Sequence, residues 1–164
     1  MRDTLLTIEQ ILSIIAGTPL RIASLTAGLA PTQLHATPNP GEWSLNDVLA
    51  HLRACNEVWG RYIKTIVAED RPTWRGVSPR AWIKSTDYLE QDFQPALQSF
   101  TARRAELLAI LEALPPEGWS RGATVIDMVG KPLERTVLSY ADSLARHERS
   151  HLKQIERLVR ALRV

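Results

Sequence analysis

Apolar residues recur at intervals of three and four along four long segments of the chain, a spacing typical of amphipathic helices. The segments are residues 4–29, 44–68, 87–114 and 133–162. Helices of this length, each with one apolar face, bury those faces against one another. The pattern therefore predicts an all-α fold, a four-helix bundle forming a single domain over residues 1–164.

The second predicted helix has the clearest start. Asn39, Pro40 and Gly41 are typical of a turn. Ser44 follows as a favoured N-cap residue, and Asp47 places a carboxylate in the first turn, where the helix dipole stabilises it. We therefore expect Ser44 to cap this helix.

Two long connections separate the last three helices. Residues 69–85 are interrupted by proline and glycine and carry Trp74 and Trp82. Residues 118–135 contain two short apolar runs, which we interpret as a loop with brief strand-like pairing. The first of these connections is longer than helix packing alone requires.

Composition narrows the class of protein. The 164 residues are 45% hydrophobic and 23% charged, which suits a globular chain, and the single cysteine excludes an intrachain disulfide. A net charge of +2 gives no electrostatic basis for nucleic-acid binding. Arg157, Arg160 and Arg163 are interpreted as a solvated helix face. Without a convincing signal peptide or an uncharged run of ~18 residues, we expect a cytoplasmic protein that does not span a membrane.

The candidate chemistry lies with three of the four histidines. His51, His147 and His151 fall on apolar helix faces, whereas His35 lies in a loop and is given no role. Residues four apart share a face, so His147 and His151 point the same way. Buried imidazoles are costly unless a partner satisfies them, and a divalent cation satisfies several at once. The sequence therefore predicts one divalent ion, zinc or nickel, bound by these three histidines with a coordination position left open.

Other interpretations of these residues stay open. A buried histidine is often a hydrogen-bonded core residue rather than a ligand. Residues 147–151 also match H-E-x-x-H, the zinc-protease motif in which Glu148 would be the general base. Arg149, the few residues after His151 and the lack of a substrate-binding edge strand disfavour a protease, so Glu148 is interpreted as a surface residue or a support for the ligands. Cys55 is interpreted as a core residue within reach of the metal.

The expected site lies nearer one end of the bundle, because His51 is about two turns into its helix. The connection 69–85 leaves that helix at the far end. We therefore expect this connection not to reach the site, and Trp74 and Trp82 to pack at a dimer contact instead.

Two stretches resemble a known family. Residues 40–52 read PGEWSLNDVLAHL and resemble the second-helix signature of the DinB-like (DinB/YfiT) superfamily. His147 and His151, followed by Gln154 and Ile155, resemble its last-helix signature. The resemblance implies an up-down-down-up bundle, often a homodimer, with a metal held by His51, His147 and His151.

Members of this superfamily include metal-dependent hydrolases, and S-transferases or isomerases that use a low-molecular-weight thiol. The resemblance thus implies a divalent-metal-dependent enzyme acting on a small-molecule substrate, by hydrolysis or thiol transfer. The alternative is a non-catalytic metal-binding or stress-related interaction protein, in which the ion only ties two helices together. A fourth protein ligand would favour that alternative.

Overall fold

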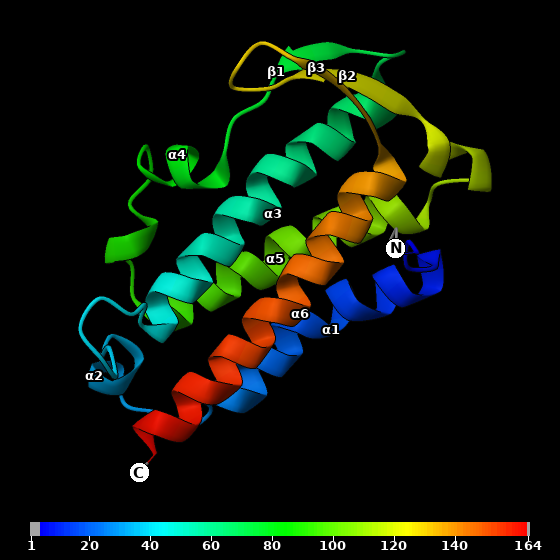
Figure 1. Cartoon of the computed structure of the whole chain (residues 1–164). Coiled ribbons are helices and arrows are strands. Elements are labelled where there is room, and N and C mark those ends of the chain that lie inside the picture. Colours follow the sequence, from blue (N-terminus) through cyan, green and yellow to red (C-terminus); the bar gives the residue numbers. More distant parts are fainter. Residues whose placement is uncertain (1–3, 164) are drawn as a thin grey trace.

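Four long helices occupy the segments that the apolar pattern predicts. The computed structural model describes residues 4–163, and its long helices are α1 (Ile8–Thr26), α3 (Leu45–Ala68), α5 (Phe93–Glu112) and α6 (Val137–Leu162) (Figure 1). The short helical elements are α2 (Pro31–Leu34), α4 (Pro79–Ile83), η1 (Tyr88–Glu90) and η2 (Pro116–Ser120). Helix α5 begins later than predicted because its N-cap, Asp92, has an extended backbone.

Helices α1 and α6 run in one direction, and α3 and α5 run in the opposite direction. Arg163, just past α6, donates a hydrogen bond to the carbonyl oxygen of Leu25 near the end of α1, so these helices end together. Arg121 instead joins the end of α3 to the start of α6, because its guanidinium donates to the Ile66 carbonyl and its own carbonyl accepts from the Val137 amide. Figure 1 shows α5 running in the direction of α3. The helices therefore follow an up-down-down-up order.

A small sheet corrects the prediction of an all-α fold. Its strands are β1 (Thr73–Arg75), β2 (Gly122–Ile126) and β3 (Pro132–Thr136). Strand β2 lies in the middle, parallel to β1 and antiparallel to β3. The hairpin agrees with the strand-like pairing expected in residues 118–135, but β1 was not predicted. Three residues are too few to show a period of two, and the partner of β1 lies about fifty residues away.

Helix α1 is the one helix in residues 4–163 whose length and hydropathy would suffice to cross a membrane. A core helix of a globular protein meets the same criteria. Ile11 and Ile15 pack into one buried cluster with residues of α3, α5 and α6, and Ile22 packs into a second. Helix α1 thus contributes to both cores of the bundle.

The start of α3 provides a first test of local structure. Ser44 Oγ accepts from the Asp47 amide at 3.1 Å, and Asp47 Oδ2 accepts from the Ser44 amide at 2.9 Å. Replacing Ser44 by alanine removes one half of this reciprocal cap, so Ser44→Ala is expected to lower the free energy of unfolding by about 1 kcal/mol. Urea unfolding measures the loss, and faster amide exchange at Asp47 locates it.

Ser44→Asn keeps a capping oxygen and is the matched control, expected to retain most of the stability. If Ser44→Ala unfolds at the wild-type urea concentration and leaves amide exchange unchanged, the cap contributes nothing.

Candidate metal centre

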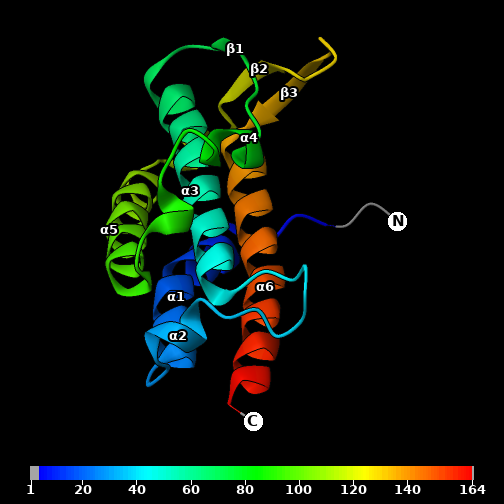
Figure 2. The same ribbon diagram turned by 90° about the vertical axis from the view of Figure 1, so that its left-hand side faces the viewer.

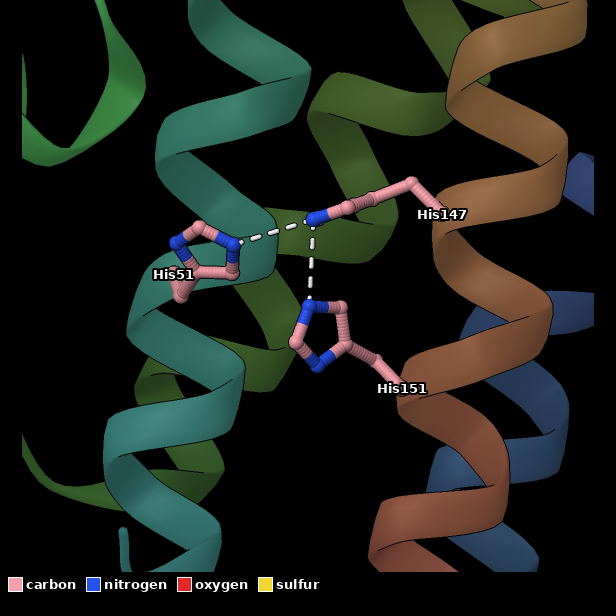
Figure 3. A group of neighbouring side chains, drawn as sticks. All are labelled: His51, His147 and His151. Atoms are coloured by element: carbon pink, nitrogen blue, oxygen red, sulfur yellow. Dashed lines mark hydrogen bonds between the residues drawn. The ribbon is translucent and has the colours of Figure 1, made fainter.

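Three histidine side chains converge between α3 and α6. His51 lies two turns into α3, while His147 and His151 lie one turn apart on the facing side of α6 (Figure 3). The Nε2 atom of His147 is 3.0 Å from Nε2 of His51 and 3.1 Å from Nε2 of His151. We call these three residues the histidine cluster; His35 stands apart, at the end of α2.

The short contacts cannot all be hydrogen bonds between neutral rings. A neutral imidazole nitrogen carries either one proton or one in-plane lone pair. Nε2 of His147 faces two other Nε2 atoms, so it can satisfy only one of them in either state. Three lone pairs directed at one cation resolve this conflict. Tetrahedral zinc with Zn–N bonds of ~2.0–2.1 Å places ligand nitrogens about 3.3 Å apart, close to the observed spacing.

The protonation state of the cluster also suits a metal. Burial, together with the nearby charges of His151 and Arg80, lowers the pKa of His51 and of His147 from 6.5 to about 4. These imidazoles are therefore neutral at pH 7, the form that donates a lone pair to a cation.

Neighbouring side chains hold the rings in place. Nδ1 of His151 lies 2.7 Å from Oε1 of Gln154, and a proton on Nδ1 leaves Nε2 free as a ligand atom. Trp59 meets the His147 ring edge to face at a centroid distance of 5.3 Å, and Trp43 lies 5.1 Å from the His51 ring. The Nε2 atoms are thus oriented by contacts from both helices.

Glu148 does not face the histidine cluster, which corrects its interpretation as a surface or supporting residue. Its side chain is fully buried, and its two carboxylate oxygens accept hydrogen bonds from Arg104 of α5. Arg104 also donates to Asn56 of α3 and to the Ile15 carbonyl of α1. One ion pair thereby connects all four long helices. Because Glu148 is committed to it, the H-E-x-x-H match does not supply a general base here.

Cys55 approaches the cluster from one side only. Its Sγ lies 3.6 Å from Nε2 of His51, yet it is not among the ligand atoms that lie within 4.8 Å of one another. Burial raises the pKa of the Cys55 thiol to about 12, so the sulfur is protonated at neutral pH. The group that could hold an ion in residues 4–163 therefore consists of three histidines.

The connection after α3 reaches the site, contrary to expectation. It leaves α3 at the far end and then turns back, so that α4 lies against α3 and in front of α6 (Figure 2). The guanidinium of Arg80, on α4, lies 5.6 Å from the ring of Trp43. Sequence periodicity gave no signal for Arg80, because the residue belongs to a connection and not to a long helix.

The returning connection contacts α3 on both sides of α4. The Tyr62 hydroxyl accepts from the Val77 amide at 2.6 Å, and Arg53 lies over the Tyr88 ring at 3.7 Å. Trp74 packs on Tyr62, with ring centroids 5.0 Å apart, and so contacts its own chain. The connection therefore forms a fixed wall beside the cluster.

Two cavities open beside the histidine cluster. The apolar cavity has a volume of about 270 Å³ and is lined by Trp43, Asp47, His51, Arg80, Ile83 and Leu89. The charged cavity has a volume of about 260 Å³ and is lined by Glu42, Trp43, Arg80, His151, Gln154, Arg157 and Leu158. Arg157, interpreted from the sequence as part of a solvated face, thus lies beside a cluster histidine.

Lowering the pH should reduce the free energy of unfolding of the metal-free protein, because the unfolded chain protonates cluster histidines that the fold keeps neutral. In the unfolded chain these imidazoles titrate near 6.5, whereas the pKa of His51 and of His147 in the fold is about 4. As the pH falls from about 6.5 towards 4, the unfolded state binds protons that the folded state does not, so stability falls. We expect this loss in urea unfolding of EDTA-treated protein at several pH values.

A His51→Leu/His147→Leu variant should lack most of this pH dependence, while His35→Ala should keep it. Parallel pH profiles for the wild type and the double variant would contradict the expectation.

A helical bundle with three converging histidines has the donor set of a metal-binding protein. Sequence comparison specifies the family. The profile of the DinB superfamily matches residues 15–155. Since that range covers most of the chain, the protein belongs to the DinB superfamily.

Two relatives agree with this assignment. The Geobacillus kaustophilus protein named "Putative metal-dependent hydrolase GK0616" is 25% identical over 114 residues, which cover 70% of this chain and 64% of the relative. The solved structure of YfiT from Bacillus subtilis, described as "a probable metal-dependent hydrolase with an unusual four-helix bundle topology", superposes with a TM-score of 0.80. At 18% identity it covers 98% of this chain and 91% of YfiT, which shows a shared fold.

Proposed function

We propose that this protein is a divalent-metal-dependent enzyme of the hydrolase type, with zinc or nickel held by His51, His147 and His151. The observation that carries the proposal is the convergence of three Nε2 atoms beside two cavities. The names of both relatives support it, since each describes a metal-dependent hydrolase.

The chain's own residues have separable roles in this proposal. His51 and His147 stay neutral because they are buried, and Gln154 orients His151 through Nδ1. Trp43 and Arg80 line both cavities and leave the cluster accessible from the α4 side. A bound divalent ion would supply Lewis-acid chemistry, polarising a carbonyl or lowering the pKa of a bound water or thiol.

Thiol-dependent S-transfer is the second candidate, and one observation favours it. Hydrolysis gains from a protein base close to the attacking water. The carboxylates that line the two cavities are Glu42 and Asp47, and Asp47 already accepts from the Ser44 amide. In residues 4–163 no carboxylate joins the group of ligand atoms around the cluster, and Glu148 is paired with Arg104. A thiol loses its proton far more readily than water does, so transfer of a low-molecular-weight thiol needs no such base.

Elemental analysis of protein purified without a metal-affinity tag is the first test. We expect about one zinc or nickel per chain. The metal-loaded protein is then assayed with 4-nitrophenyl esters alone, and with cysteine or glutathione plus 1-chloro-2,4-dinitrobenzene. Ester cleavage without thiol supports the hydrolase, and thiol-dependent product supports the transferase.

The matched controls are His35→Ala, expected to behave as the wild type, and the His51→Ala/His147→Ala/His151→Ala variant, expected to be inactive. Full metal occupancy in the triple variant would exclude this site. A metal-bound structure with Cys55 as fourth ligand would favour the non-catalytic alternative.

A further inference from the structure

The apolar cavity and the charged cavity share one boundary and flank one centre. Trp43 and Arg80 line both of them. Each cavity also contains one residue of the histidine cluster, His51 in the apolar cavity and His151 in the charged cavity. A molecule that occupies both cavities must therefore pass beside the histidine cluster.

The charged cavity holds two guanidinium groups without an acidic partner. Neither Arg80 nor Arg157 forms an ion pair among residues 4–163, whereas Arg21, Arg103 and Arg146 each do. Unpaired guanidiniums on the wall of a cavity provide planar, forked donors that suit a carboxylate. Their position marks the charged cavity as the place for an anionic group.

Gln154 adds a neutral donor to the same cavity. Its Oε1 faces Nδ1 of His151 at 2.7 Å, so the amide oxygen is engaged and the amide nitrogen remains to donate. The acidic residue of this cavity is Glu42, and its charge opposes a ligand with two negative charges. A single carboxylate fits this balance better than a phosphate monoester does.

The apolar cavity suits a different part of the ligand. Ile83 and Leu89 line it together with Trp43, and Leu89 is 47% exposed although it is a large aliphatic side chain. Its one acidic residue, Asp47, already accepts a hydrogen bond from the Ser44 amide. An aliphatic chain would cover these side chains and exclude water from them.

We infer that the substrate is an amphipathic monocarboxylate, with its carboxylate between Arg80 and Arg157 and its aliphatic part against Ile83 and Leu89. The group that reacts would then lie between the two ends, beside the histidine cluster. This inference rests on the proposed function and specifies its substrate class.

Binding of simple probes to the zinc-loaded protein tests the inference without an assay of activity. Hexanoate, hexanamide and hexyl phosphate share an alkyl chain and differ in the head group. We expect hexanoate to bind at least about tenfold more tightly than hexanamide in titrations followed by amide chemical shifts. Arg80→Met and Arg157→Met should each weaken hexanoate binding about fivefold and leave hexanamide binding unchanged.

Arg160→Met is the matched control, because Arg160 is an exposed arginine of α6 that does not line either cavity. It should bind hexanoate as the wild type does. Equal affinity for hexanoate and hexanamide would overturn the inference, as would wild-type hexanoate affinity in both Arg80→Met and Arg157→Met. Tighter, arginine-dependent binding of hexyl phosphate would overturn the choice of a carboxylate.

The His147→Ala variant separates this inference from the proposed function, because His147 belongs to the histidine cluster but lines neither cavity. If that variant still prefers hexanoate in an Arg157-dependent manner, the cavities recognise carboxylates. If elemental analysis also finds no metal in the wild type, the metal-dependent function is contradicted, while the carboxylate inference stands.

Discussion

The Glu148→Ala variant is expected to lose about 3–5 kcal/mol of free energy of unfolding, a large fraction of the stability of a domain of this size. Glu148 and Arg104 are 0% and 1% exposed. Removing the carboxylate would leave the guanidinium buried without its countercharge, although it would keep hydrogen bonds to Asn56 and the Ile15 carbonyl. Urea unfolding of the metal-free protein measures the loss.

Glu156→Ala is the matched control on the same helix. Glu156 pairs with Arg21 at 2.7 Å, but the Arg21 side chain is 54% exposed, so this substitution should cost less than about 1 kcal/mol. An Arg104→Met/Glu148→Leu double variant should recover much of the stability lost by Glu148→Ala, because no unpaired charge remains. If Glu148→Ala costs no more than Glu156→Ala, the buried pair does not stabilise the bundle as described.

His147→Ala is expected to weaken metal binding by more than about a hundredfold. Loss of a residue that only supports a ligand commonly costs about 10–100-fold in metal affinity, and loss of a ligand should exceed that. His147 is the central member of the cluster, since its Nε2 contacts the Nε2 atoms of both other histidines. Titration of EDTA-stripped protein with zinc in a competing chelator measures the change.

Gln154→Ala tests the support of His151 in the same titration, with an expected loss of about 10–100-fold. His35→Ala removes a histidine outside the cluster and should leave zinc affinity unchanged. Equal zinc affinity in the wild type and in His147→Ala would show that the metal binds elsewhere.

The amino-acid sequence predicted the helices and the histidine cluster for one physical reason. Both depend on helical periodicity, which determines that residues four apart on a buried face point the same way. His147 and His151 therefore had to lie together, and His51 had to point inward from its own helix. The cap at Ser44 followed from residue type and spacing.

Other features depend on contacts between distant segments, which periodicity does not contain. Strand β1 exists through its pairing with β2, and α4 meets the site because its connection turns back along α3. Glu148 is next to a predicted ligand in sequence, yet on the helix it points towards Arg104. The sequence could not predict that Glu148 is buried, because its basic partner, Arg104, lies on a different helix, α5.

The fixed connection that carries α4 contributes to ligand preference, whereas metal affinity depends on the helices that carry the cluster histidines. The cluster histidines belong to α3 and α6, whose positions depend on the core, whereas Arg80 belongs to a surface segment anchored through Tyr62 and Tyr88. Changes in this segment can therefore alter the Arg80 side of both cavities, while α3 and α6 keep the packing that positions the cluster histidines. Grafting residues 77–91 between two family members should accordingly change the part of head-group preference that depends on Arg80 and preserve metal affinity.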